Sequence, residues 1–264
     1  MKLGFSTVMY EGTNLLLSHI ISKAATLGYE GVELNFRERP STLDVNEIRG
    51  ALKTFSIRVA AIGTRHMHIT HGLYLASPHG KVREKAITYI TECMELANKL
   101  NCSIVQAGWA FQGSKLEAPS ETTWKNAVRS LKEVGRRALN YGVNFVIEYQ
   151  NKNDAKLVNT MDDALRILDE VGYDNVLVMA DTFHMNLEDP SLEESILKAG
   201  KRLGYVHLAD SDRLAPGEGR IDFRGFIRAL RKIYYEGYLV MEFEPKPNPD
   251  DALGRAIKFI GSLL

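Results

Sequence analysis

Short apolar runs alternate with longer amphipathic segments from one end of the chain to the other. The runs have the length and continuous hydrophobicity that is typical of strands buried on both faces of a parallel sheet. Eight of them begin near Lys2, Gly31, Ile57, Ser103, Val143, Asn175, Gly204 and Tyr238. Strand and helix patterns that alternate eight times within 264 residues predict a single-domain α/β protein, a (β/α)8 barrel over residues 1–264.

The segments between these runs carry apolar residues at helical spacing. One stripe steps by three or four residues through Val82, Ala86, Ile90, Cys93, Ala97 and Leu100, and a second runs through Trp124, Val128, Leu131, Val134 and Ala138. Each stripe predicts a helix with one face against a core. A doubly wound open sheet is the alternative topology, but no Gly-x-Gly-x-x-Gly follows any of the strands.

Residues typical of helix ends agree with this division. A glycine lies between a helical segment and the next strand at positions Gly28, Gly142, Gly172, Gly204 and Gly237, where we expect left-handed helix caps. Thr160 with Asp163 resembles a capping box, and Asn248 followed by Pro249 resembles an N-cap with proline in the first turn.

The long connections all follow strands and none precedes one. They span residues 66–80, 108–120, 149–159 and 211–222. In a (β/α)8 barrel the strand-to-helix loops form the active site, whereas the helix-to-strand turns stay short. The asymmetry therefore predicts that the C-terminal ends of the strands carry the function.

Composition and charge narrow the class of protein. The chain has 33 basic and 33 acidic residues, so its formal net charge is zero and nothing favours nucleic acid or an anionic membrane as a partner. No apolar run is long enough to span a bilayer and no secretory leader is evident, so we expect a cytoplasmic protein. Cys93 and Cys102 lack metal-type spacing, and Cys93 is expected to be a buried, reduced thiol.

Four apolar runs in the second half of the chain end in a polar, ionisable residue: Glu148, Asp181, His207 and Glu242. Such groups at the ends of buried strands are costly unless something pairs with them, and a shared cation is the simplest partner. Carboxylates and one imidazole suit Mn²⁺, Mg²⁺ or Co²⁺ better than a thiolate zinc site does. The alternatives are four unrelated strand-end residues, or Glu244 in place of Glu242, since both have the same strand parity.

The residues around these four resemble a known family. They include Asp181-Thr182-Phe183-His184, His207 followed six residues later by Arg213, the segment Pro216-Gly217-Glu218-Gly219, and Trp109 after Ala107-Gly108. In these motifs the chain resembles the xylose-isomerase-like TIM barrels, and within them the D-tagatose 3-epimerase (D-psicose 3-epimerase) group. The resemblance covers nearly the whole chain and is strongest from Glu148 onward.

The resemblance implies a divalent-metal-dependent ketose 3-epimerase that acts on a small sugar. One ion, Mn²⁺ by preference and otherwise Co²⁺ or Mg²⁺, would be held by Glu148, Asp181, His207 and Glu242. Relatives of this group are commonly homodimers or homotetramers, so we expect a homo-oligomer.

Inversion at C3 requires a base and an acid on opposite sides of the carbon, with an enediolate between the two proton transfers. We assign these roles to Glu148 and Glu242, and we expect Asp181 and His207 to anchor the ion. His184 and Arg213 would bind substrate oxygens, and Trp109 would form a pocket wall.

The chain departs from the group's pattern at two positions near Glu148. Asp154 stands where the epimerases usually have Glu, and Tyr149 stands where many relatives have Pro. We still expect Asp154 to contact the substrate, but these differences leave the identity of the sugar open, including whether it is phosphorylated.

Other functions on the same scaffold stay open. A hydroxypyruvate isomerase or an inosose isomerase or dehydratase would use the same four ligands. AP endonucleases share the barrel, but they carry a histidine after the fourth strand, where this chain has Gln106-Ala107-Gly108. A non-catalytic sugar-binding protein is a further alternative.

Two features near the active face remain ambiguous in the sequence. Glu33 in the second strand could be a pocket residue or a hydrogen-bonding group in the barrel core. His66, His68 and His71 follow the third strand, and we interpret them as part of a solvated active-site loop rather than as a second metal site.

Overall fold

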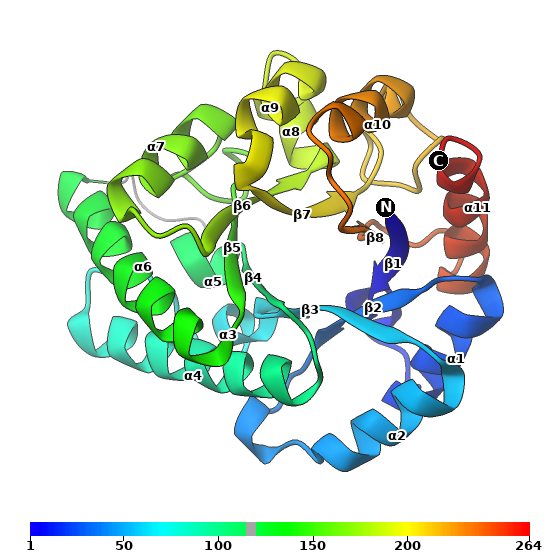
Figure 1. The fold of residues 1–264 in the computed structure, drawn as a ribbon, viewed down its shortest axis with the longest axis horizontal. Coiled ribbons are helices and arrows are strands. Elements are labelled where there is room, and N and C mark those ends of the chain that lie inside the picture. The colour runs from blue at the N-terminus through cyan, green and yellow to red at the C-terminus, as the bar shows by residue number, and fades with distance from the viewer. Residues whose placement is uncertain (115–119) are drawn as a thin grey trace.

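Eight parallel strands close into a barrel in chain order, with helices around the outside (Figure 1). The computed structural model describes residues 1–114 and 120–264. The strands are β1 (Lys2–Ser6), β2 (Gly31–Asn35), β3 (Arg58–Gly63), β4 (Ile104–Ala107), β5 (Asn144–Glu148), β6 (Val176–Asp181), β7 (Leu203–Leu208) and β8 (Tyr238–Met241). Each begins within one residue of its predicted start, and β1 pairs with β8 to close the barrel. The predicted single-domain (β/α)8 barrel is confirmed.

The outer layer consists of the longer helices, which lie between successive strands (Figure 1). They are α1 (Leu17–Leu27), α2 (Val45–Phe55), α4 (Gly80–Lys99), α6 (Glu121–Tyr141), α7 (Met161–Val171), α9 (Leu192–Ala199), α10 (Phe223–Lys232) and α11 (Pro249–Gly261). Both predicted helical stripes lie on such helices: α4 buries Ala86, Ile90, Cys93 and Ala97, and α6 buries Leu131, Val134 and Ala138. Within the described residues, no helix is both long and apolar enough to cross a bilayer.

Three short helices directly follow strands and were not predicted. They are α3 (Arg65–Ile69), α5 (Trp109–Gln112) and α8 (Thr182–Glu188), and three 3-10 turns accompany them elsewhere: η1 (Thr7–Tyr10), η2 (Pro40–Thr42) and η3 (Gly200–Arg202). One or two turns of helix are too short to show a 3.6-residue period. They nevertheless matter, because they lie in the strand-to-helix connections, at the C-terminal end of the barrel. Residues 115–119 of the connection after β4 lie outside the described part of the chain.

The predicted helix ends are partly confirmed. Gly28, Gly142 and Gly172 adopt the left-handed conformation, with φ of 89°, 65° and 67°. The prediction was wrong for Gly204 and Gly237, neither of which has a positive φ. Gly204 lies inside β7, where a Cβ atom would come within 2.6 Å of Val146 Cγ1, so close packing rather than a turn requires glycine there.

The two predicted N-terminal helix signals are both present. Thr160 Oγ1 accepts from the Asp163 amide at 3.1 Å and Asp163 Oδ2 accepts from the Thr160 amide at 3.2 Å, which completes a capping box. Asn248 caps α11 by accepting from the Asp251 amide at 3.0 Å. These caps fix where α7 and α11 begin and therefore set the length of the loops that precede them.

Two separate apolar layers hold the barrel together. Small and medium side chains fill its interior, among them Ala60, Val146, Met179 and Val240, together with the ring of Tyr205. A larger layer lies between the strands and the helices, and it contains Cys93 and Cys102, which are both buried and unbonded. The interior is therefore packed through its middle, and a hollow lies at each end of the barrel.

Candidate metal centre and active site

Four ionisable side chains meet at the C-terminal end of the barrel. Glu148 is the last residue of β5, Asp181 is the last residue of β6, His207 lies near the end of β7 and Glu242 follows β8. One ligand atom from each lies within 4.8 Å of the corresponding atoms of the other three. Adjacent strands bring them together: Asp181 and His207 are direct partners in the β6–β7 pairing. The structure thus assembles the four residues that the strand-end pattern singled out.

This cluster fits a divalent cation. Glu148 Oε1 is buried and has no hydrogen-bond partner among the described residues, and His207 Nδ1 faces the Glu242 carboxylate at 3.2 Å. A buried carboxylate oxygen without a partner is costly, and more so beside two further carboxylates. Three carboxylates and one imidazole form an oxygen-rich ligand set of the kind that Mn²⁺ and Mg²⁺ prefer.

The cluster separates the pKa values of its carboxylates. Burial, with added repulsion from Asp181 and Glu242, raises the pKa of Glu148 well above its usual value. Burial acts in the same direction on Glu242, but the nearby His207 and Arg213 outweigh it and lower the pKa of Glu242. In the metal-free site, therefore, Glu148 favours the protonated form and Glu242 the ionised form.

Glu33 holds His207 in position. Its Oε2 lies 2.7 Å from His207 Nε2, and its Oε1 accepts from Ser6 Oγ at 2.9 Å and from Asn35 Nδ2 at 2.8 Å. With Nε2 used by Glu33, Nδ1 faces the cluster and lies 3.2 Å from Glu242 Oε2. Burial disfavours the imidazolium, but the carboxylates of Glu33 and Glu242 raise the pKa of His207. Glu33 is therefore a hydrogen-bonding group of the barrel interior, the second of the two roles considered for it, and it orients a candidate metal ligand.

Asp181 has two tasks in one side chain. Its Oδ1 accepts from the amides of Phe183 at 2.8 Å and His184 at 3.3 Å, so it caps the short helix α8. That cap fixes the carboxylate against β6 and also fixes where α8 begins. The same bond thereby sets the position of His184, three residues along the chain.

His184 presents a free N–H to the site. Its Nδ1 accepts from Asn151 Nδ2 at 2.9 Å and faces the Asn151 amide at 3.3 Å. Because Nδ1 is an acceptor, the ring proton is on Nε2, and burial lowers the pKa of His184, which keeps the ring neutral. Nε2 is buried, lacks a partner among the described residues and lies 3.9 Å from Glu148 Oε1. It is therefore a donor available to a ligand beside Glu148.

Asp154 and Arg213 lie together on the same side of the site. Asp154 Oδ2 accepts from Asn151 Nδ2 at 2.7 Å and lies 3.8 Å from Arg213 Nη1. The guanidinium is 4.9 Å from the centre of the Phe183 ring. Arg213 has a left-handed backbone, with φ of 61°, in the loop after β7. Burial alone would favour the neutral form, but the surrounding carboxylates raise the pKa of Arg213.

A cavity of about 520 Å³ opens above this cluster. Its lining includes Trp109, Asp154, Arg213 and Glu242, together with Arg65, which the sequence did not single out. Arg65 packs over the Trp109 ring at 5.1 Å, and the indole N–H of Trp109 is buried without a partner among the described residues. Arg65 follows β3 directly, but a basic residue in a loop carries no sequence signal that separates it from surface charge. The cavity is large enough for a monosaccharide.

Two ambiguous predictions are resolved by the geometry. Glu244 is exposed and lies 3.1 Å from Lys246, outside the four-residue cluster, so it does not replace Glu242 there. The solvated-loop prediction was wrong for His66, which is buried and 3.3 Å from Glu11, and for the half-buried His68, which is 2.8 Å from Ser114 Oγ. Among the described residues the three histidines form no second metal group, because they have different neighbours: Glu11 for His66, Ser114 for His68 and the Tyr89 ring for His71.

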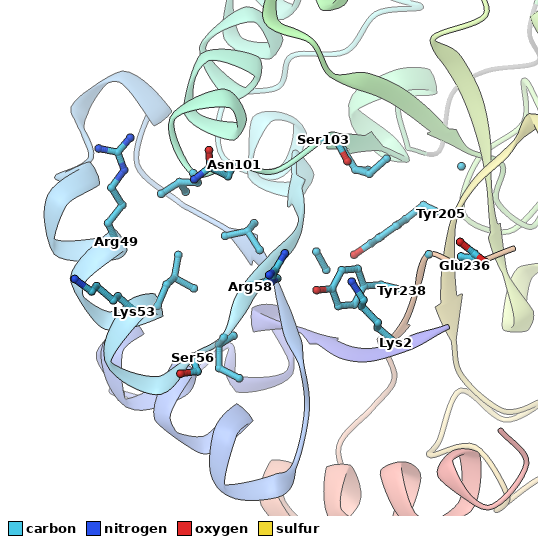
Figure 2. Close-up of a pocket in the computed structure, with 18 residues that line it drawn as sticks. Lys2, Arg49, Lys53, Ser56, Arg58, Asn101, Ser103, Tyr205, Glu236 and Tyr238 are labelled. Atoms are coloured by element: carbon cyan, nitrogen blue, oxygen red, sulfur yellow. The ribbon is translucent and has the colours of Figure 1, made fainter.

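A second, larger hollow of about 980 Å³ lies at the opposite, N-terminal end of the barrel. Its lining combines residues from β1, β3, β7 and β8 with others from α2, and Figure 2 shows basic side chains around it. Size alone therefore does not identify the active site. Within the described residues, no member of the four-residue cluster lines the larger hollow, whereas Glu242 lines the smaller one.

Comparison with known proteins identifies the family and agrees with the fold. The family model of the xylose isomerase-like TIM barrels matches residues 21–263, so the chain belongs to that family. A D-psicose 3-epimerase of Ruminiclostridium cellulolyticum is 30% identical over 85% of this chain and 77% of its own length. An L-ribulose 3-epimerase of Methylomonas sp. is 28% identical over 91% of this chain and 89% of its own length.

The solved structures give the same result. A D-allulose 3-epimerase from Methylomonas sp., solved in complex with D-allulose, superimposes with a TM-score of 0.88 at 26% identity and covers 100% of this chain and 97% of its own. The chain is accordingly an enzyme of the carbohydrate epimerase and isomerase class.

Proposed function

We propose that the protein is a divalent-metal-dependent ketose 3-epimerase. The observation that carries the proposal is the cluster of Glu148, Asp181, His207 and Glu242, whose ligand atoms lie within 4.8 Å of one another beside a sugar-sized cavity. The relatives named above, which are 28–30% identical to this chain, act on ketoses at C3. Mn²⁺ is the ion that we expect, with Co²⁺ or Mg²⁺ as alternatives.

The ion would be held by the four clustered residues. When bound, it supplies positive charge that stabilises the negative charge developing on the carbonyl oxygen of the ketose. Asp181 and His207 keep the ligand set rigid, because Asp181 is fixed by its bonds to α8 and His207 by its bond to Glu33. Rigid ligands avoid the cost of reorganising the site during each turnover.

Glu148 and Glu242 would move the proton. One carboxylate removes the C3 proton from one face of the sugar, and the other carboxylate returns a proton to the opposite face. Their positions support this division, since Glu148 ends β5 and Glu242 follows β8, at the two ends of the run of strands that supplies the cluster. In the reverse reaction the two groups exchange roles.

The residues above the cluster would orient the sugar. The free Nε2–H of His184 donates to a substrate oxygen beside Glu148, and Arg213 adds a charged donor at the same side. Asp154 accepts from a substrate hydroxyl, and Trp109 covers an apolar face of the sugar ring or chain. Together they exclude water from the carbon that loses its proton.

The test is to incubate the Mn²⁺-loaded protein with a panel of ketoses in deuterated water and to follow the products by NMR. Inversion at C3, with deuterium appearing at that carbon, is the expected result. An aldose product that carries deuterium at C2, with deuterium at C1 of the recovered ketose, would instead assign an aldose–ketose isomerase. Absence of C3 exchange for every ketose in the panel would rule out the epimerase.

A second measurement tests the dependence on a metal. Chelation followed by gel filtration should abolish C3 exchange, and adding Mn²⁺ back should restore it. Metal content is measured on the same samples by mass spectrometry. Full activity in protein with almost no bound metal would contradict the proposal.

A further inference from the structure

The hollow at the N-terminal end of the barrel is lined by basic side chains that lack ion-pair partners. Lys2 comes from β1, Arg49 and Lys53 from α2, and Arg58 from β3 (Figure 2). None of these four forms an ion pair with any described residue, although many other basic residues of this chain do. Arg49 instead donates to the carbonyl of Lys99 at 3.0 Å.

The charge around this hollow is positive. The four basic residues face one acidic residue of the lining, Glu236, and a second carboxylate, Glu30, lines the neighbouring hollow beside Lys2 and Arg58. Four positive charges less two negative charges leave a local excess of two. A neutral protein that gathers unpaired cations around one concave surface creates a local field that attracts anions.

Two phenol groups add unused hydrogen-bond donors to the same hollow. The Tyr205 side chain is 1% exposed, and its buried hydroxyl makes no well-formed hydrogen bond to a described residue, although burial and the nearby Glu33 carboxylate raise the pKa of Tyr205. The buried hydroxyl of Tyr238 also lacks a hydrogen-bond partner among the described residues. Figure 2 shows the Tyr205 oxygen directed from β7 toward Arg58 and Tyr238. Buried polar groups are normally satisfied, so two unsatisfied donors beside unpaired cations indicate a missing acceptor.

The shape and chemistry of the hollow define the class of ligand. Guanidinium, ammonium and phenol groups are donors that approach from several directions, an arrangement suited to the oxygens of a phosphate group. The volume of about 980 Å³ exceeds what an inorganic anion needs, and Leu52, Ile57 and Leu100 give part of the wall an apolar character. The buried hydroxyl of Tyr205 lies too deep to contact a macromolecule that rests on the surface.

We propose that this hollow binds a small phosphorylated metabolite, with its phosphate between Arg58, Lys2 and the two tyrosine hydroxyls and its organic part against the apolar wall. The site is at the opposite end of the barrel from the candidate metal centre. It does not depend on which reaction the metal centre performs, and it is distinct from any phosphate carried by the substrate.

The test is a calorimetric titration of the intact, metal-loaded protein with phenyl phosphate, using benzoate as the matched carboxylate. We expect saturable binding of phenyl phosphate that is at least about tenfold tighter than that of benzoate, because phosphate offers more acceptor oxygens and more charge. Arg58→Gln combined with Lys2→Gln should weaken binding by about tenfold or more, and Tyr205→Phe by several-fold. Lys125→Gln is the matched control, since Lys125 is exposed on α6 and paired with Glu121.

Circular dichroism and a thermal melt establish that each variant is folded. Arg58 and Lys2 are exposed, so their variants keep the test valid if Tyr205→Phe does not fold. Several results would overturn the proposal. They are the absence of saturable binding at millimolar phenyl phosphate, equal affinity for benzoate, and unchanged affinity in the double variant. Binding that disappears on chelation but survives in the double variant would place the anion at the metal centre instead.

Discussion

The two ends of the barrel are opposites in charge and in how that charge is held. At the C-terminal end, three carboxylates and His207 are packed together, and Glu33 and the α8 amides fix two of them in place. At the N-terminal end, Lys2, Arg58 and their basic neighbours line a larger hollow and form no ion pairs with the described residues. The C-terminal end therefore holds four ionisable side chains in fixed positions, whereas the N-terminal end carries basic side chains with fewer supporting contacts.

The difference follows from where the chain places its short helices and loops. After β3, β4 and β6 the chain turns at once into α3, α5 and α8, which lie over the strand ends and supply Arg65, Trp109 and His184. Before the strands the connections are short turns, and of the four basic side chains there only Arg49 makes a hydrogen bond to a described residue, the carbonyl of Lys99. Close positioning of catalytic groups requires such supporting elements. We therefore expect substitutions at the C-terminal end of the barrel to affect catalysis more than substitutions at the N-terminal end.

The largest effect is expected from removing either proton carrier. Glu148→Gln and Glu242→Gln should each lower the rate of C3 exchange by about 10³-fold, because a positioned acid or base contributes roughly 10²–10⁴ and each residue is also a candidate ligand. Exchange is measured by NMR on samples of known metal content, so that loss of the ion is distinguished from loss of the base. A variant that keeps both its metal and its wild-type rate would contradict the assigned role.

The same added methyl group should have different consequences at the two ends. At Gly108 a Cβ atom would collide with Glu148 Oε2, and at Gly31 it would come within 2.5 Å of the Tyr238 ring. Gly108→Ala should reduce the exchange rate by about 10²-fold, the cost of a small displacement in an active site. Gly31→Ala should instead lower the free energy of unfolding by about 1–3 kcal/mol through overpacking. Rates and urea unfolding curves of both variants check this, and similar profiles for the two variants would contradict it.

Substitution of Glu33 should change the affinity for the metal ion rather than the fold of the protein. Glu33→Gln keeps the shape but weakens the bond to His207, and we expect metal affinity to fall by about 10–100-fold. Ser6→Ala is the matched control, because it removes the 2.9 Å bond to Glu33 and leaves the bond between Glu33 and His207 in place. Calorimetric titration with Mn²⁺ measures both variants. Equal losses in the two would mean that Glu33 acts only as part of the core network.

The strands and the four clustered residues could be predicted from the sequence for one physical reason. A buried parallel strand must be apolar, so a charged residue at its end, such as Glu148 or Asp181, stands out from the pattern. The same logic could have found the role of Glu33, which interrupts an apolar strand, but pattern alone does not show that it faces His207 across the barrel. That contact joins residues 174 positions apart.

The features that the sequence did not predict depend on packing rather than pattern. Helices α3, α5 and α8 are too short to show periodicity, so the burial of His66 and the placement of Arg65 could not be read from spacing. Gly204 and Gly237 look like helix caps in the sequence, yet Gly204 is needed because β7 passes close to Val146. The unpaired cations of the N-terminal hollow were equally hidden, since a lysine or arginine in the sequence does not reveal whether it has a partner.

The smallest effect concerns the stability of the metal-free protein as a function of pH. A carboxyl whose pKa is raised by folding stabilises the protein below its unfolded pKa, and that stabilisation is lost as the pH rises through the folded pKa. Because burial and neighbouring carboxylates raise the pKa of Glu148, metal-free protein should lose stability as the pH rises from about 4.5, the usual value for Glu. In Glu148→Gln this loss should be smaller, so the variant becomes the more stable of the two at neutral pH, by on the order of 1 kcal/mol. Urea unfolding of chelated samples between acid and neutral pH measures the difference, with Glu121→Gln as an exposed control. Parallel curves for the wild type and Glu148→Gln would mean that the C-terminal end stores no charge repulsion for the metal to relieve, and the contrast between the two ends would then lie in geometry alone.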